Sequence, residues 1–306
     1  MSTFKKLGAF MKGNTKFTIG VILVGFVLIM TFGAPLFTTI DPNYRFTDMY
    51  RITPSWEHLL GTTQLGRDVF SQTLYGGRKS IMVGLLAAVI TTTLSMIVGI
   101  SAGYLGGKWD AVVSTVTNIM MVIPTIVLLL IIASMMEDGV SPLLISLIIG
   151  LTSWPWNSRV LRAQTMSIRG RDFVRSAETL GEGKFRILFF EIMPNMLSII
   201  STAFIGTLIY SIMAHATLEF IGLGDPFSVT LGTILYNAQN TGAFRSGAYY
   251  EAAGAIIILV FIGMGLTLIN FAIDEISNPK LKAQSIMKEY YKARKIEEKA
   301  AKAKKS

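Results

Sequence analysis

Six long stretches of this chain contain no charged side chain, and they limit the folds that it can adopt. They run over residues 17–40, 81–107, 111–136, 139–158, 192–214 and 252–273. Each is near or above the roughly 20 residues that a helix needs to cross about 30 Å of hydrocarbon. They are continuously apolar and lack the alternation of membrane β-barrel strands. The sequence therefore predicts an all-α polytopic membrane protein with six transmembrane helices and no separate soluble domain.

Composition excludes several classes of function. Charged residues make up 15% of the chain, against about 25% in a soluble domain. The chain has no cysteine, which excludes disulfides, thiolate catalysis and cysteine-based metal sites. The net charge of +9 does not indicate nucleic-acid binding, because the basic residues cluster beside the apolar stretches instead of on one soluble face.

Motifs for catalysis and for ATP binding are also missing from the sequence. The segment GEGKF at 181–185 has the wrong spacing for a phosphate-binding loop, and it follows no buried strand. The two histidines, His58 and His215, lie far apart in the sequence, and no cluster has metal-ligand spacing. We therefore expect no catalytic residue, no bound cofactor, no metal and no ATP hydrolysis by this chain.

The positions of lysine and arginine predict the orientation in the membrane. Of 28 such residues, four precede residue 17, Lys108 follows the second span, seven lie between 159 and 186, and ten follow Asp274. The other six lie in the loops on the opposite side of the membrane. The side that carries 22 of the 28 basic residues is therefore expected to be cytoplasmic. The expected organisation is a cytoplasmic segment 1–16, a six-helix membrane domain 17–273 and a cytoplasmic tail 274–306. Within the membrane domain, we expect outer loops at 41–79, 137–141 and 223–251 and a cytoplasmic loop at 159–194.

Several residues within or between the spans suggest particular roles. The polar run 171–195 must lie at the membrane surface, where another protein can press on it. A helix from about Asp172 to Leu180 would end at Gly181, since glycine favours the left-handed turn that ends many helices. His215 and Glu219 lie about one turn apart at the end of the fifth span. Ionisable groups at membrane depth are costly and often functional. Either both reach water at the outer end, or one of them lines the passage.

Small residues and prolines predict how the spans pack. Gly99 and Gly103 are four residues apart, a spacing that lets two helix backbones approach closely in lipid. Pro124 and Pro155 lie inside the third and fourth predicted spans, where proline is expected to kink a helix.

Several motifs, in order along the chain, resemble those of the dipeptide/oligopeptide/nickel-type ABC importer permeases. They are GTTQLGRD at 61–68, YGGRKS at 75–80, AGYLGG at 102–107, SWP at 153–155, LEFIGLGDP at 218–226 and NPKL at 278–281. The long first span followed directly by the 61–68 motif resembles the second, C-type permease of the pair in that family.

The polar run resembles the cytoplasmic loop of these permeases. Their pattern is Glu-Ala-Ala, three residues, Gly, then a hydrophobic residue and Pro before the next span. Here Arg175-Ser176-Ala177 precedes Gly181 by three residues, and Pro194 follows. The first Glu and the first Ala of the pattern are replaced.

The resemblance implies the type I ABC importer permease fold and a division of labour. This chain would be one of two permeases in a heterodimer, multi-pass in the cell (inner) membrane of a bacterium or archaeon, with both termini cytoplasmic. Two ATP-binding cassette subunits would hold ATP and Mg²⁺, and an extracytoplasmic binding protein would deliver dipeptides or oligopeptides. Oligosaccharides and nickel chelates are alternative cargoes. A stand-alone channel or secondary transporter is the alternative of a different class.

The resemblance also assigns candidate sites. Phe173 and Phe185 would anchor in a groove on the ATPase, with basic residues around them. The expected coupling residues are Asp172, Phe173, Arg175, Ser176, Ala177, Gly181, Phe185, Arg186 and Pro194. The residues expected to dock the binding protein are Arg67, Asp68 and Asp225. The candidates to line the passage are His215 and Glu219, because they are ionisable groups at the end of a span.

Overall fold

The computed structural model describes residues 14–136 and 139–277, and its regular elements are helices. In the described residues the first half of the chain forms α2 (Thr15–Phe32), α3 (Ala34–Phe37), α4 (Val69–Leu105), α5 (Gly107–Val122), α6 (Thr125–Ser134), α7 (Pro142–Thr152) and α8 (Trp154–Arg169). The second half forms α9 (Asp172–Thr179), α10 (Lys184–Arg186), η1 (Ile187–Ile192), η2 (Met193–Met196), α11 (Leu197–Phe220), α12 (Leu231–Asn240) and α13 (Tyr250–Ser277). Pairing of β type is limited, in these ranges, to isolated bridges such as that between Thr62 and Asp68. The all-α class predicted from the sequence is confirmed.

The number of continuous spans is smaller than the six predicted. By length and composition, four helical segments of the described chain could cross a membrane, and α5 with α6 forms a fifth if that bent pair is one span. The four are Thr15–Phe32, Val69–Leu105, Lys184–Phe220 and Tyr250–Glu275. The predicted window 139–158 is divided instead between α7, which has 11 residues, and α8, with Pro155 in the first turn of α8. Proline has no N–H to continue the preceding helix, so the window does not form one apolar helix.

The other predicted kink lies at Pro124, between α5 and α6. These two helices are bent by 72° at the break, so the proline ends one helix and redirects the chain, as expected. The predicted outer loop 41–79 is shorter than expected, because α4 begins at Val69 and continues to Leu105 without interruption.

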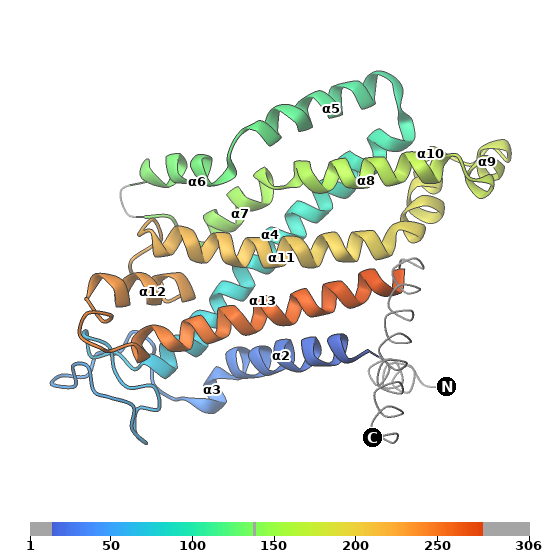
Figure 1. Cartoon of the computed structure of the whole chain (residues 1–306). Helices are drawn as coiled ribbons and strands as arrows, with labels where there is room; N and C mark the ends of the chain where they lie inside the picture. Colours follow the sequence, from blue (N-terminus) through green and yellow to red (C-terminus); the bar gives the residue numbers. More distant parts are fainter. Residues whose placement is uncertain (1–13, 137–138, 278–306) are drawn as a thin grey trace, which may run out of the picture.

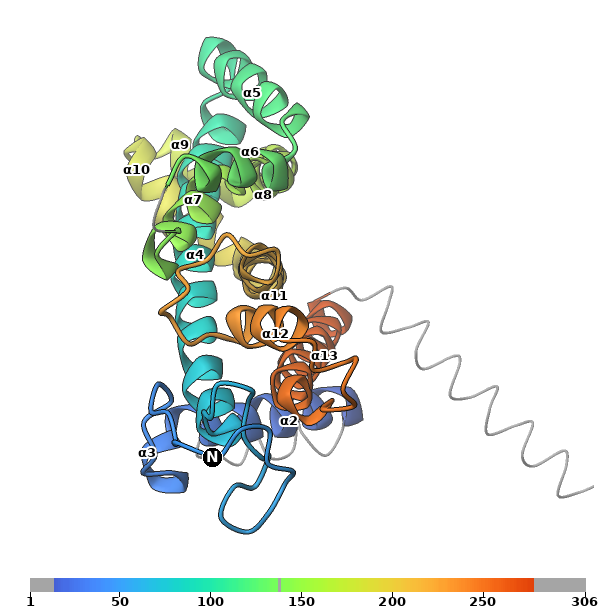
Figure 2. The ribbon, with the colours of Figure 1, turned by 90° about the vertical axis from the view of Figure 1, so that its left-hand side faces the viewer.

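Helix α4 crosses the whole bundle. Figure 2 shows it passing from α2 and α13 at one side, along α11 and α7, to α5 at the other, and it packs most extensively against α8, α11 and α7. Its glycines permit this contact: a β-carbon on Gly99 would lie 3.0 Å from Cα of Ser158, and one on Gly103 would lie 2.7 Å from Cβ of Thr165. The close helix approach predicted from Gly99 and Gly103 is confirmed.

The two ends of the bundle differ in what they carry. The start of α2 and the end of α13 lie at the same end as α9 and α10, whereas α12 and the loop between α3 and α4 lie at the opposite end (Figure 1). Lys16 and Glu275 form an ion pair of 3.1 Å that joins α2 to α13 there. We call these the α9 end and the α12 end. The basic segments of the described chain that were predicted to share one side gather at the α9 end.

Candidate functional site

The turn after α9 is built by local sequence. Asp172 lies in the first turn of α9, where a negative charge complements the helix dipole. The helix ends at Thr179, and Gly181 follows with φ of +77°. The N–H of Gly181 donates to the carbonyl of Glu178, and the N–H of Glu182 donates to the carbonyl of Ala177, each at 3.1 Å. These two bonds form a Schellman cap. The predicted helix and its glycine stop are confirmed.

One face of α9 holds the turn against the bundle. Val174 and Ala177 are buried in a cluster with Ile187, Ile192 and Tyr104, which come from η1 and α4. Arg175, Ser176 and Asp172 are exposed on the other face. The buried face of α9 is apolar and packs against η1 and α8, and η1 in turn contacts α4.

The apolar side chains that project from this turn differ from those expected. Phe173 is half-buried and packs against the same cluster, so its predicted role as an anchor on the ATPase stays a prediction. Phe185 is 70% exposed and stacks on Phe189, with ring centroids 4.4 Å apart. Leu180 is 80% exposed and was missed, although its position directly before Gly181 marks it as the tip of the turn.

Two further members of the predicted coupling set lie beside or beyond the turn. Arg186 forms an ion pair of 3.0 Å with Glu182, one helical turn away. Pro194 lies in η2, after the π-helical segment η1, where the chain enters α11. Proline has no backbone N–H and cannot donate the i→i−4 hydrogen bond of an α-helix. Pro194 therefore explains why the chain is irregular through η1 and η2. Pro194 thus determines how the chain enters α11, and it lies away from the tip of the α9 turn.

At the α12 end, two of the expected docking residues have structural contacts. Asp68 is buried; its Oδ1 accepts from the N–H of Ser71 at 2.6 Å, which caps α4, and its Oδ2 lies 2.7 Å from Nδ1 of His58. Its assignment as a docking residue is therefore wrong. Asp225 is half-buried and accepts from the N–H of Phe227 at 2.9 Å. Arg67 is also half-buried, and burial followed by the charge of Arg45 lowers its guanidinium pKa.

Large aromatic side chains are among the exposed groups at this end. The most exposed include Trp56 at 96%, Phe227 at 84%, Tyr249 at 63% and Tyr50 at 59%. Large aromatic residues are enriched where protein surfaces meet.

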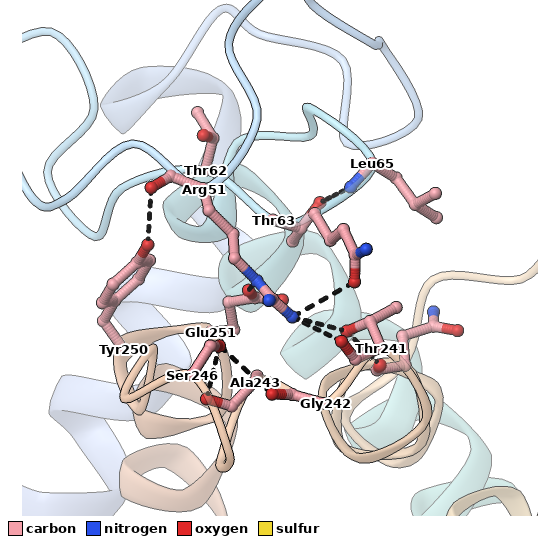
Figure 3. Close-up of polar contacts among 12 residues, drawn as sticks. Arg51, Thr62, Thr63, Leu65, Thr241, Gly242, Ala243, Ser246, Tyr250 and Glu251 are labelled. Atoms are coloured by element: carbon pink, nitrogen blue, oxygen red, sulfur yellow. Dashed lines mark hydrogen bonds and ion pairs between the residues drawn. The ribbon is translucent and has the colours of Figure 1, made fainter.

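The long loop before α4 is fastened to the start of α13. Arg51 Nε donates to Oε1 of the buried Glu251 at 2.8 Å, and its Nη2 donates to the carbonyl of Thr241 at 2.6 Å (Figure 3). The hydroxyl of Tyr250 donates to the carbonyl of Arg51 at 3.0 Å. Residues about 200 positions apart thus form one rigid platform at the α12 end.

His215 and Glu219 are fully buried, which overturns the expectation that both reach water. Their side chains are 0% and 1% exposed, with Nε2 and Oε1 3.3 Å apart. The Thr230 hydroxyl donates to the other oxygen of Glu219. The N-terminal turn of α12 covers Glu219: a β-carbon on Gly232 would lie 2.6 Å from Cβ of Glu219. A contact between α11 and α12 thus decides their exposure.

A cavity of about 600 Å³ lies where two pairs of helices are broken. It is bounded by the α5–α6 bend, the α7–α8 junction and α11. Asn157 donates to Thr207 across one wall at 2.7 Å, and Trp156 and Tyr210 also line it. None of the described residues that line it is charged, and neither His215 nor Glu219 is among them. Irregular backbone at membrane depth is tolerated where it lines such a cavity.

The fold and these sites define a multi-pass helical membrane protein of the transport class. Residues 95–283 match the family described as binding-protein-dependent transport system inner membrane component. The chain belongs to that family.

Individual relatives agree with this assignment. The chain is 32% identical to a putative peptide permease protein of Brucella suis biovar 1 (strain 1330), over 83% of this chain and 85% of the relative. It is 27% identical to the oligopeptide transport system permease protein OppC of Bacillus subtilis (strain 168), over 89% and 88%. It is 28% identical to the dipeptide transport system permease protein DppC of Haemophilus influenzae, over 89% and 93%. A solved structure of the MetNI methionine ABC transporter in inward-facing conformations aligns with a TM-score of 0.45 and 21% identity, over 65% of this chain and 93% of that chain.

Proposed function

We propose that this chain is one permease subunit of an ATP-driven ABC importer that carries peptides delivered by an extracytoplasmic binding protein. The observation that carries the proposal is the α9 turn, with Leu180 and Phe185 projecting from a tip whose other face is fixed in the bundle. Its relatives support the cargo class, since they are named as peptide, oligopeptide and dipeptide permeases.

The α9 turn suits a role in receiving force from a partner. A side chain anchored in a groove transmits motion only if its own backbone is rigid, and the Schellman cap at Gly181 supplies that rigidity. Leu180 and Phe185 are the apolar anchors, and exposed Arg175 and Arg186 surround them with positive charge. The sequence contains no phosphate-binding loop, which supports the proposal that two partner ATPases hold ATP and Mg²⁺.

The orientation of the chain in the membrane is inferred from the basic residues at the α9 end. The α9 end holds the start of α2, the end of α13 and the basic α8–α10 segment. An excess of lysine and arginine faces the cytoplasm, which supports this end as the ATPase side and a cytoplasmic location for both termini. The α12 end then faces outward and meets the binding protein, with Trp56, Phe227 and Tyr249 as contact residues.

Transport itself is assigned to the 600 Å³ cavity and to a second permease that completes it. Its lining of Thr152, Asn157, Thr202, Thr207 and Tyr210 offers polar groups without a fixed charge. Such a surface lets cargo of varied charge pass without holding it, so that the binding protein selects the cargo.

Purification of the native complex followed by identification of its subunits tests the proposal most directly. We expect a second permease and two ATPases in the purified complex, and ATP-dependent peptide uptake when it is reconstituted with the binding protein. Recovery of this chain as an active transporter without any ATPase would establish a stand-alone channel or secondary transporter instead. Thermal-shift screening of the binding protein separates peptides from oligosaccharides and nickel chelates.

A further inference from the structure

Arg51, in the long loop before α4, has a strained backbone. Its φ is +52°, in the left-handed region that residues with a β-carbon seldom adopt. Such a conformation persists only where the surrounding contacts hold it. Here the N–H of Arg51 donates to the carbonyl of Thr63 at 3.1 Å, and its carbonyl accepts from the hydroxyl of Tyr250 at 3.0 Å. Strain that is held by a contact with a distant segment suggests a function for the residue.

The guanidinium of Arg51 joins three segments of the chain (Figure 3). Its Nε donates to Glu251, which lies in the first turn of α13. Its Nη2 donates to the carbonyl of Thr241, the C-cap of α12, and to Oε1 of Gln64 in the loop itself at 3.2 Å. A positive charge is favourable beside the last carbonyls of a helix, and a carboxylate is favourable in the first turn. The arginine therefore suits both of the helix ends that it joins.

The carboxylate of Glu251 depends on this contact. The residue is 2% exposed, and its ion pair in the described chain is with Arg51. A buried carboxylate that loses its partner is costly, so the pair resists separation. A lysine ammonium has no planar fork and could not hold Glu251 and Thr241 with the same geometry. Arg51 thus fixes how the loop lies against the end of α12 and the start of α13.

Exposed aromatic side chains lie on both of the segments that Arg51 joins. The loop before α4 carries Tyr50 and Trp56, which are 59% and 96% exposed. The connection from α12 to α13 carries Phe244 and Tyr249, which are 42% and 63% exposed and have ring centroids 6.4 Å apart. Large aromatic residues are enriched where protein surfaces meet. A partner that contacts both segments meets one surface only while the two are held in a fixed relative position.

We propose that Arg51 positions these two segments as one docking surface for the extracytoplasmic binding protein. It is a positioning residue, which acts through the segments that it joins. Ordering two independent segments at the moment of docking costs affinity, and a surface that is held in place beforehand avoids this cost. The inference rests on the proposed function for its partner, whereas the relative position of the two segments is a property of this chain alone.

The first test measures the positions of the two segments directly. The chain has no cysteine, so Glu57→Cys and Arg245→Cys place one spin label at an exposed position on each segment, with partner subunits that are free of cysteine. Pulsed electron–electron double resonance on the whole complex in lipid nanodiscs should give one narrow distance distribution. We expect Arg51→Met combined with Glu251→Gln to broaden it, because the bridge is lost while no buried charge is left unpaired. An unchanged distribution overturns the proposal.

The second test measures docking. The unlabelled complex is titrated with the peptide-loaded binding protein while ATP hydrolysis is followed. We expect the Arg51→Met and Glu251→Gln double variant to raise the concentration of binding protein for half-maximal stimulation by roughly tenfold, with basal and maximal rates unchanged. Arg51→Lys should give a smaller rise, since its ammonium group keeps part of the bridge. Arg45→Met is the matched control, because it removes a positive charge from an exposed position of the same loop, and it should behave as wild type.

The titration separates a positioning role from its alternatives. A lower maximal rate with an unchanged half-maximal concentration would show that the pair serves folding only, and it overturns the proposal. An equal rise with Arg45→Met would show that loss of charge is the cause, and it overturns the proposal too. If the binding protein stimulates wild type and the double variant alike, the role of Arg51 is rejected and the import function stands. If it does not stimulate wild type, the import function is contradicted, and the docking role of Arg51 is contradicted with it.

Discussion

Asp110 and Arg162 form a two-point ion pair that ties α5 to α8. Arg162 Nη2 donates to Oδ2 of Asp110 at 2.7 Å, and Nε donates to Oδ1. Helix α5 packs mainly against α8 and α4, so this pair is its one charged attachment to the bundle in the described residues. The α5–α6 bend forms a wall of the 600 Å³ cavity, and the pair therefore fixes the position of that wall.

We expect Arg162→Lys to lower the stability of the purified complex by about 1 kcal/mol, because lysine cannot form a two-point pair and both side chains are only partly shielded from water. Thermal unfolding in detergent measures the change. Arg159→Lys is the matched control, since Arg159 is exposed on the same helix. A double-mutant cycle with Asp110→Asn should give a coupling energy of similar size, and a coupling energy of zero would show that the pair does not hold α5 to α8.

Two glycines of the α9–α10 loop provide a test of coupling. A β-carbon on Gly181 or on Gly183 would meet no other atom within 4 Å, but only Gly181 of the two has a positive φ, at +77°. Alanine at Gly181 should therefore cost about 1–2 kcal/mol in that left-handed conformation and loosen the turn. We expect Gly181→Ala to retain ATPase activity while peptide uptake falls several-fold, and Gly183→Ala to retain both.

The ratio of uptake to ATP hydrolysis in proteoliposomes is the measurement. If Gly181→Ala transports with the normal ratio, rigidity of the turn is not required for coupling, and α9 would have to act by contact alone.

The exposed anchors give a separate prediction. Leu180→Ala and Phe185→Ala each remove an apolar side chain that is 80% or 70% exposed in the isolated chain, so folding should be unaffected. Each should reduce the amount of ATPase that co-purifies with the permease by roughly tenfold, as expected for an anchor buried at an interface. Leu36→Ala, an 88% exposed position in α3 at the opposite end, should have no effect. Equal loss with Leu36→Ala would indicate a general effect on assembly.

Local signals account for the parts of this structure that the sequence predicted well. The α9 helix and its stop depend on Gly181 and its immediate neighbours, and the break between α5 and α6 depends on Pro124. The spacing of Val174 and Ala177, three residues apart, also indicated the buried face of α9 and could have shown that Phe173 lies next to it. Asp68 directly before α4 is a typical helix N-cap, so its structural role was also within reach of the sequence.

Long-range packing accounts for what the sequence could not predict. The burial of His215 and Glu219 depends on α12, which folds back onto α11. The spacing of apolar residues in the sequence does not indicate this contact. The Arg51–Glu251 contact joins segments 200 residues apart and involves a non-glycine residue with φ of 52°. Pro155 indicated a kink in 139–158, but the apolar composition continues through the break at Ser153 and so did not show that two separate helices form there.

The contact between α4 and α8 supports the last prediction. Gly99 and Gly103 lie against α8, whereas a β-carbon on Gly25 in α2 would meet no atom within 4 Å. Gly99→Ala must therefore push two helix backbones apart, at a cost typical of overpacking, about 1–3 kcal/mol. Gly25→Ala should be neutral or slightly stabilising, since alanine has the higher helix propensity. Thermal unfolding and the yield of folded protein in membranes compare the two variants. If Gly99→Ala is as stable as Gly25→Ala, then α8 can move away from α4. The bundle would in that case be too loose to carry a force from α9 to α4.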